Sequence, residues 1–314
     1  MDAAPAEDVA ALPQHAPRPP TAADAAPAPP RPERGMDAIP LRRAQQEPAL
    51  VAAALERHSF AVIALGERDA RAVRDCAASA REFFQSTPDA GKARLRQSFA
   101  DAGGEGLVGY NRPHAAKEVV RVRRGCHDAV PRCPVSLRGR VLGAFDVLER
   151  VAVCAWRAAR AAAAPDCAED ELGLVVGPGS EAISSSPFDL MYYANDAAAA
   201  AEPNSTPHVD SPGLVTAIPV AGTPGLRVRD RATGDVVEAE RRYRPHADVV
   251  VFVDAALQAL SRGRLRACTH DVAKGPAPRL SLVYELRPAM AVAADILAPQ
   301  GRKRRRAPDP PPGD

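Results

Sequence analysis

The chain has 314 residues, of which 46% are hydrophobic and 25% charged, and its formal net charge is +2 at pH 7. This composition is typical of a folded globular protein with a substantial core, organised as one large or two smaller domains. The near balance of charge gives no argument for nucleic acid or an anionic membrane as a partner. No uncharged run of about 18 apolar residues is present that would predict a membrane span.

Six cysteines are scattered along the chain without the spacing of a metal-binding knuckle: Cys76, Cys126, Cys133, Cys154, Cys167 and Cys268. This pattern predicts reduced thiols in a reducing compartment. The first residues include acids and lack the apolar core of a signal peptide, so we expect a cytoplasmic protein. The basic run Arg302–Arg306 has two interpretations, a nuclear localisation signal or a solvated tail.

The first third of the chain predicts a tail followed by helices around one strand. Residues 1–40 hold ten prolines and no apolar periodicity, which indicates a disordered segment. Residues 49–57 form a short helical pattern, and residues 60–65 an apolar run typical of a buried strand. A second helix should begin at Asp69, a suitable N-cap. The glycine-rich segment 103–109 lacks the residues of a phosphate loop, so we interpret it as a flexible loop.

The middle of the chain carries the longest helical pattern, and the last third changes to strands. Between Leu137 and Ala164 apolar residues recur every three or four positions, which predicts one long amphipathic helix behind a β-barrel. Between Phe188 and Leu286 the apolar period falls to two and turn residues are frequent. The predicted fold class is therefore mainly β with flanking helices, built around a double-stranded β-helix, the jelly-roll architecture.

Two histidines and one carboxylate stand out in this strand-rich region. His208 and Asp210 are separated by one residue, so on a β-strand both side chains would point to one face and Val209 to the other. His270 follows 62 residues after His208, which is enough for several short strands before the chain returns. Two histidines and a carboxylate are the ligand set of a non-haem Fe(II) centre with open coordination positions. We therefore predict that these three residues bind iron and form the catalytic centre.

Two further polar residues follow His270 in an apolar alternation. Arg279 and Ser281 would lie on one face of a strand over residues 279–286. A guanidinium group with a hydroxyl two residues away can bind a small carboxylate bidentately in a desolvated pocket.

The order of these motifs resembles that of the 2-oxoglutarate/Fe(II)-dependent oxygenases, specifically the isopenicillin N synthase-like branch. The resemblance covers roughly residues 40–290. It implies that the His-x-Asp motif and the distal histidine bind iron, and that Arg279 and Ser281 bind the far carboxylate of 2-oxoglutarate. Residues 190–193 resemble the family's Asn-Tyr-Tyr strand, which makes Tyr193 a candidate co-substrate contact.

The chain departs from the family pattern on the substrate side of the pocket. Met191 stands in place of the usual asparagine, Ala194-Asn195 in place of the usual prolines, and Val253-Asp254 in place of a Gly-Asp. Residues 109–110 and 117–123 resemble the Gly-Tyr and Lys-Glu segment that runs past the family's substrate opening. This resemblance makes Tyr110, Arg121 and Arg123 candidate substrate contacts. An edge strand with solvated arginines is an equally good interpretation of the segment.

The resemblance implies an Fe(II)- and 2-oxoglutarate-dependent dioxygenase. In such an enzyme dioxygen and 2-oxoglutarate are co-substrates, succinate and CO2 are released, and a C–H bond of a small organic substrate is oxidised, with hydroxylation as the expected outcome. Because Asp210 is present, no ligand position is vacant for a halide, which argues against halogenation. Two alternatives stay open: an iron oxidase of the same fold that does not use 2-oxoglutarate, and a non-catalytic ligand-binding barrel.

These patterns divide the chain into four parts. Residues 1–40 and 291–314 are predicted disordered tails, residues 41–180 a helical region with a few strands, and residues 181–290 the Fe(II)/2-oxoglutarate barrel. We expect a monomer whose partner is a small-molecule substrate.

Overall fold

The computed structural model describes residues 36–95, 97–101, 104–125, 135–178, 182–195 and 203–298, with only the backbone for 97–101, 104–107 and 135–136. Both predicted disordered tails extend too far into the chain, because Ile39–Pro40 form a strand and Met290–Leu297 a helix. The rest of the tails, including Arg302–Arg306, lies outside the described residues apart from a few positions, as do Cys126 and Cys133. The other four cysteines form no disulfide bond. Within the described residues, every helix is too short or too polar to cross a membrane.

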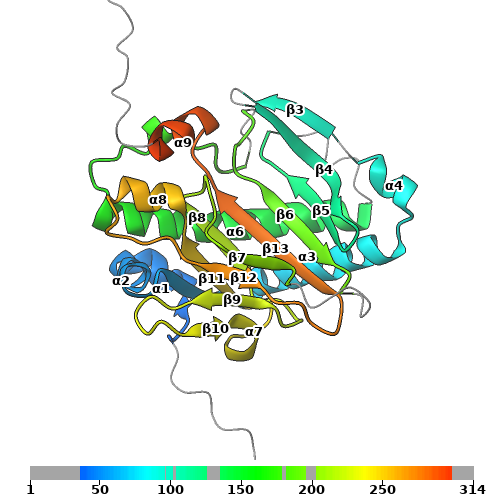
Figure 1. The fold of residues 1–314 in the computed structure, drawn as a ribbon, viewed down its shortest axis with the longest axis horizontal. Helices are drawn as coiled ribbons and strands as arrows, with labels where there is room; N and C mark the ends of the chain where they lie inside the picture. Colours follow the sequence, from blue (N-terminus) through cyan, green and yellow to red (C-terminus); the bar gives the residue numbers. More distant parts are fainter. Residues whose placement is uncertain are drawn as a thin grey trace, which may run out of the picture. The chain divides into compact units, whose positions relative to one another are not determined.

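A nine-stranded sheet joins strands from both halves of the chain (Figure 1). Its order is β1-β2-β11-β8-β13-β6-β5-β4-β3, so strands predicted for the N-terminal region pair with strands predicted for the barrel. The strands are β1 (Ile39–Pro40), β2 (Phe60–Ala64), β3 (Gln97–Asp101), β4 (Gly104–His114), β5 (Lys117–Val122), β6 (Phe188–Tyr193), β8 (Val215–Pro219), β11 (Asp248–Val253) and β13 (Arg279–Leu286).

A second sheet of four strands faces part of the first (Figure 1). Its order is β10-β9-β12-β7, with β7 (Ser205–His208), β9 (Leu226–Arg229), β10 (Val236–Glu238) and β12 (His270–Val272). Buried side chains between the sheets form one cluster, in which Val228 of β9 packs with Val62 of β2 and Phe252 of β11. Two facing sheets with flanking helices are the arrangement expected of a jelly-roll core.

Helices cover the outer face of the large sheet and its ends (Figure 1). The longest, α6 (Val135–Ala163), contacts α3 as well as β8 and β13. Its Phe145 ring meets Phe188 and Tyr284 edge-on, with centroids 5.5 and 5.4 Å away. The other helices are α1 (Leu41–Gln46), α2 (Pro48–His58), α3 (Glu67–Ser86), α4 (Asp89–Ala93), α7 (Ala239–Arg242), α8 (Ala255–Leu260) and α9 (Met290–Leu297), with one 3-10 turn at Asp170–Leu172.

Several predicted elements are confirmed, and two local interpretations are wrong. The helix predicted over 49–57 and the strand over 60–65 are α2 and β2. The second helix begins at Glu67 with Gly66 as its N-cap, so Asp69 lies in the first turn, where it accepts a hydrogen bond from Arg150 (2.7 Å). Residues 104–109 belong to β4 and not to a loop, because pairing with β3 and β5 supplies their backbone hydrogen bonds.

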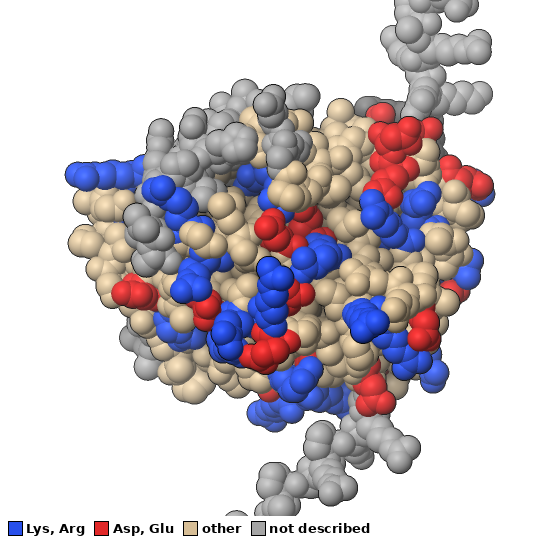
Figure 2. Space-filling model, turned by 180° about the vertical axis from the view of Figure 1, so that it is seen from behind, with Lys and Arg blue, Asp and Glu red and all other residues tan. Residues whose placement is uncertain are grey.

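Charged side chains of both signs are interspersed on the described part of the face opposite to that of Figure 1 (Figure 2). Ion pairs on the protein surface also link α3 and α6, such as Arg140–Asp75 at 2.8 Å and Arg150–Asp69 at 2.7 Å. Pairs of this kind add little stability, but they leave positive charge locally compensated.

Candidate active site

Antiparallel pairing of β7 and β12 brings the two predicted histidine ligands together. His208 is the last residue of β7 and is the direct partner of His270, the first residue of β12. The two imidazole rings have centroids 4.3 Å apart and are tilted by 53°. Residues 62 positions apart in the sequence thus become neighbours across one strand pair.

Asp210 reaches the histidines from the loop that follows β7 and not from the strand itself. β7 ends at His208, so the prediction that both ligands share one strand face is wrong. Val209, which was expected to pack on the opposite face, is 41% exposed. The backbone carbonyl of Asp210 accepts a hydrogen bond from the N–H of Ala255, the first residue of α8 (3.0 Å). A contact with a distant helix therefore fixes the position of this ligand.

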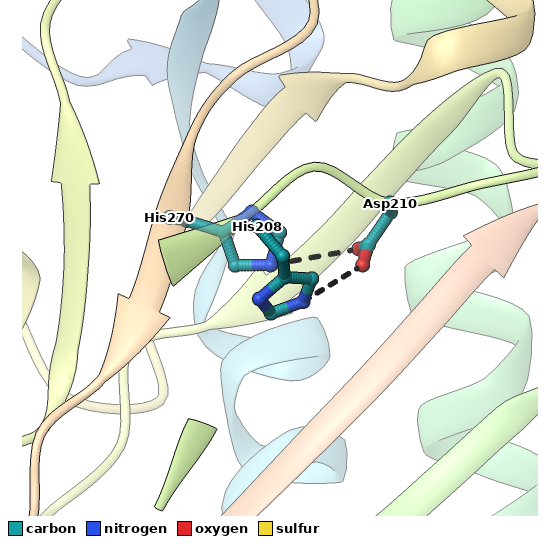
Figure 3. Close-up of side chains that lie close together, drawn as sticks. All are labelled: His208, Asp210 and His270. Carbon is teal, nitrogen blue, oxygen red and sulfur yellow. Dashed lines mark ion pairs between the residues drawn. The ribbon is translucent and has the colours of Figure 1, made fainter. Parts of the chain in front are cut away.

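The three side chains converge on one point (Figure 3). His208 Nε2 lies 3.3 Å from Asp210 Oδ1, and His270 Nε2 lies 3.7 Å from Asp210 Oδ2. One ligand atom from each residue falls within 4.8 Å of the others. Because metal–nitrogen and metal–oxygen bonds are about 2 Å long, a single ion can contact all three atoms. The donor set is that of an Fe(II) centre with open positions, so the residues fit this metal.

The far nitrogen of each imidazole is held by the backbone. His208 Nδ1 lies 2.8 Å from the carbonyl oxygen of Thr206, and His270 Nδ1 lies 3.2 Å from that of Cys268. A carbonyl can only accept, so Nδ1 carries the proton in both rings and Nε2 keeps its lone pair for a metal.

Asp210 is kept ionised by its neighbours. Burial raises the pKa of Asp210. When the two histidines are protonated, the hydrogen bond from His208 and the positive charges of both rings outweigh burial and hold this pKa below its ordinary value. The Thr216 hydroxyl donates to Asp210 Oδ2 (3.1 Å) and also lies 2.9 Å from Asp254 Oδ2. Burial raises the pKa of Asp254 well above the ordinary range. A protonated Asp254 can donate to Thr216, which leaves the threonine proton for Asp210.

Arg279 has one occupied and one free end of its guanidinium group. The side chain is fully buried at the start of β13. Its Nη1 donates to the carbonyl of Thr223 and lies 2.8 Å from Glu240 Oε1. Its Nε and Nη2 have no hydrogen-bond partner among the described residues. These two nitrogens form one edge of the guanidinium plane, the edge that binds a carboxylate bidentately, so the residue fits the carboxylate of a co-substrate.

The backbone beside Arg279 leaves little room for a side chain at Gly225. A Cβ added at Gly225 would lie 2.9 Å from Arg279 Cδ and 3.0 Å from Arg279 Nε. The N–H groups of Gly225 and Leu226 both donate to Glu240 Oε2 at 3.1 Å. The turn before β9 therefore positions both partners of the Arg279–Glu240 ion pair.

The remaining predicted co-substrate residues lie on the same stretch of sheet as Arg279. Tyr193 is the direct cross-strand partner of Arg279, and Ser281 that of Met191. Tyr193 and Ser281 are 2% and 3% exposed, so both face the interior. Burial raises the pKa of Tyr193 to about 12, which keeps its hydroxyl protonated as a donor.

Only part of the predicted substrate-contact set shares this face. On β5, Arg121 pairs with Asp189 of β6 through two hydrogen bonds of 2.7 and 2.6 Å. Tyr110 is the partner of Val120, one position out of phase with Arg121, and its hydroxyl donates to Glu118 (2.8 Å) on the opposite face. Tyr110 is therefore directed away from the surface that carries Tyr193.

Sequence reasoning did not single out three residues that contact or adjoin the site. Thr216 is hydrogen-bonded to Asp210, Glu240 is paired with Arg279, and Lys117 lies over the Tyr193 ring, with Nζ 5.4 Å from its centroid. Their spacing from the motif residues follows no strand or helix period. The Lys-Glu segment was the single signal that could have pointed to Lys117.

Known proteins share this fold at low sequence identity. Neither a model of a protein family nor a curated protein sequence matches the chain. Among solved structures, a candidate 2OG-Fe(II) oxygenase family protein from Caulobacter crescentus is 19% identical, with a TM-score of 0.58 over 81% of this chain and 87% of that one. A full-length Neurospora crassa protein in complex with alpha-KG (2-oxoglutarate) is 17% identical, with a TM-score of 0.59 over 81% and 85%.

A third similar structure is the Arabidopsis thaliana dioxygenase for auxin oxidation 1 in a binary complex with 2-oxoglutarate. It is 17% identical, with a TM-score of 0.60 over 82% of this chain and 94% of that one. The chain thus shares the fold of these three structures, which is the fold that the resemblance in the sequence motifs implied.

Proposed function

We propose that this protein is an Fe(II)- and 2-oxoglutarate-dependent dioxygenase that oxidises a small organic substrate, by hydroxylation, with release of succinate and CO2. The observation that carries the proposal is the convergence of His208, Asp210 and His270 in a fold shared with proteins solved with 2-oxoglutarate. A binding-only barrel would not need three convergent metal ligands. This argues against the non-catalytic alternative.

Each residue has a defined part in this proposal. The two histidines and Asp210 hold Fe(II), which together with 2-oxoglutarate supplies the oxidising power for attack on a C–H bond. Arg279 binds the far carboxylate of 2-oxoglutarate through its free Nε–Nη2 edge, and Tyr193 and Ser281 offer hydroxyl donors beside it. The buried apolar side chains between the two sheets exclude water from the site.

The test is an anaerobic titration of 2-oxoglutarate into the Fe(II)-loaded full chain, followed by absorption spectroscopy. We expect a metal-to-ligand charge-transfer band in the wild type and, under oxygen, formation of succinate. His208→Ala, Asp210→Ala and His270→Ala should each lower iron occupancy and abolish turnover while the melting curve stays cooperative. Full activity in any one of them would refute the assignment of the metal site.

A specific observation also favours the co-substrate-free oxidase. Glu240 already supplies a carboxylate 2.8 Å from Arg279, so the charge of this arginine is compensated within the protein. A site that binds no dicarboxylate would need such compensation. The same titration separates the two functions. An oxidase of this kind would bind Fe(II) but give no charge-transfer band with 2-oxoglutarate. It would oxidise its substrate with dioxygen in the absence of 2-oxoglutarate, and no succinate would form.

The finer architecture and cellular setting are part of the proposal. We infer that α6, through its contacts with β8 and β13, supports the jelly-roll core over residues 181–290. We also infer that the protein is a monomer. We infer that it acts in the cytoplasm, a reducing compartment that agrees with described cysteines that form no disulfide bond.

A further inference from the structure

We propose that Lys117 binds an anionic group of the primary substrate, so that the substrate class is a small organic acid carrying a carboxylate or a phosphate. This inference rests on the proposed function and deepens it. It concerns the substrate and not 2-oxoglutarate, whose far carboxylate we assign to Arg279.

The position of Lys117 follows from strand register. Tyr193 of β6 is the direct partner of Lys117 on β5 on one side and of Arg279 on β13 on the other. Direct partners on adjacent strands project from the same face of a sheet. Lys117, Tyr193 and Arg279 therefore form one row across three strands. The tyrosine ring separates the lysine from the arginine, with Lys117 Nζ 5.4 Å from the ring centroid.

The row faces the metal ligands. Val283, on the same face of β13 as Arg279, packs in the cluster between the two sheets together with Val228 and Cys268. This face of the large sheet is therefore turned toward the small sheet, whose strands β7 and β12 carry His208 and His270. An anion held by Lys117 would place the rest of a small molecule beside the metal.

The carboxylates around Lys117 are already engaged. Asp189 accepts two hydrogen bonds from Arg121, and Asp210 is bound by Thr216 and paired with the two histidines. Among the described residues, none forms a hydrogen bond or ion pair with Lys117 Nζ. Lys117 thus differs from Lys92, whose ammonium donates to Glu118 at 2.8 Å on the opposite face.

The free ammonium is also poorly solvated. Lys117 is half-buried, and burial lowers its pKa in spite of the nearby carboxylates. A half-buried cation without a counter-ion keeps an unmet demand for an acceptor, and an anionic ligand oxygen would meet it with a charge-assisted hydrogen bond. A neutral substrate would leave that demand unmet.

The experiment compares matched acids and amides as ligands of the full chain loaded with Fe(II) and 2-oxoglutarate, without oxygen. The matched pairs of probes are phenylacetate with phenylacetamide and hexanoate with hexanamide, and phenyl phosphate is a further anion. Binding of each probe is measured by the shift of the charge-transfer band and by the change in melting temperature. The variants are Lys117→Gln and the control Arg112→Gln. Arg112 lies on the same β4–β5 hairpin, but its exposed guanidinium is paired with Asp89 (3.2 Å).

We expect at least one anion to bind the wild type about tenfold or more tightly than its neutral analogue, the scale of a hydrogen bond to a charged group. Lys117→Gln should remove this preference, and Arg112→Gln should keep it. Comparison of the carboxylate probes with phenyl phosphate shows which anionic group the site prefers. Equal binding of acids and amides, binding of none of the anions, or a preference that survives in Lys117→Gln would overturn the proposal.

Affinity for 2-oxoglutarate provides the second readout. It should be the same in Lys117→Gln and wild type, because Arg279 is unchanged. A parallel loss of 2-oxoglutarate affinity would overturn the inference by assigning Lys117 to the co-substrate site. If the wild type binds no 2-oxoglutarate, the proposed function fails. The binding of the anions and amides is then measured by the shift in melting temperature of the protein loaded with Fe(II) alone, which still tests the role of Lys117.

Discussion

Arg279 offers only one edge of its guanidinium group to a ligand because Glu240 and the Thr223 carbonyl hold the other end. Lysine would keep the charge but lose the planar fork. We predict that Arg279→Lys weakens 2-oxoglutarate binding by roughly 1–3 kcal/mol, and that Arg279→Ala weakens it further. Iron binding should change little, since neither variant alters a metal ligand. The measurement is the anaerobic titration, and an unchanged dissociation constant in Arg279→Ala would remove this residue from the site.

Thr216 is the second residue whose role can be isolated. Its hydroxyl donates to Asp210 and contacts Asp254, so it orients the carboxylate ligand without touching the metal. Thr216→Val keeps the shape but removes the donor, and we expect iron affinity to fall by about 10- to 100-fold, the range for partners that orient metal ligands. Thr216→Ser retains the hydroxyl and serves as the control. Equal iron affinity in the valine and serine variants would contradict the prediction.

At the scale of elements, α6 stabilises the sheet through a few aromatic contacts. Phe145 is 1% exposed and meets the rings of Phe188 and Tyr284. We predict that Phe145→Ala lowers the free energy of unfolding by about 3–5 kcal/mol, because it removes buried area and leaves a cavity. Leu142→Ala, on the same helix at 42% exposure, should change it by less than about 0.5 kcal/mol. Denaturant unfolding measures both, and similar losses would show that α6 packs differently.

Element boundaries were predictable where the pattern was long and periodic. The range expected for the longest helix nearly coincides with α6, because many apolar positions at helical spacing act together. The glycine-rich segment was misinterpreted because its strand state depends on pairing with β3 and β5, which outweighs the low strand propensity of glycine. The second helix begins two residues before Asp69, since a helix end depends on single contacts, here the hydrogen bond from the Ala70 N–H to the Gly66 carbonyl (2.9 Å).

At the scale of the whole molecule, the boundary of the folded unit lies before β1. Met36 and Ala38 pack against the core cluster between the two sheets, and β1 pairs with β2. We predict that deleting residues 1–34 leaves the melting temperature and turnover unchanged. Deleting residues 1–40 should lower stability by about 1–3 kcal/mol, the scale of burying one or two apolar side chains. Calorimetry of the two truncations tests this, and an equal effect of both would place the boundary elsewhere.

The candidate metal ligands and the approximate positions of most strands and helices were predictable from the sequence alone. Imidazole and carboxylate groups are chemical properties of His208, Asp210 and His270, and periodicity is local. Only the folded structure shows that Asp210 lies in the loop after β7, that Glu240 pairs with Arg279, and that Lys117 contacts the Tyr193 ring without an ion-pair partner among the described residues. The physical reason is that pairing and burial are set by residues far apart in the chain, whose positions follow from strand register and packing rather than from spacing.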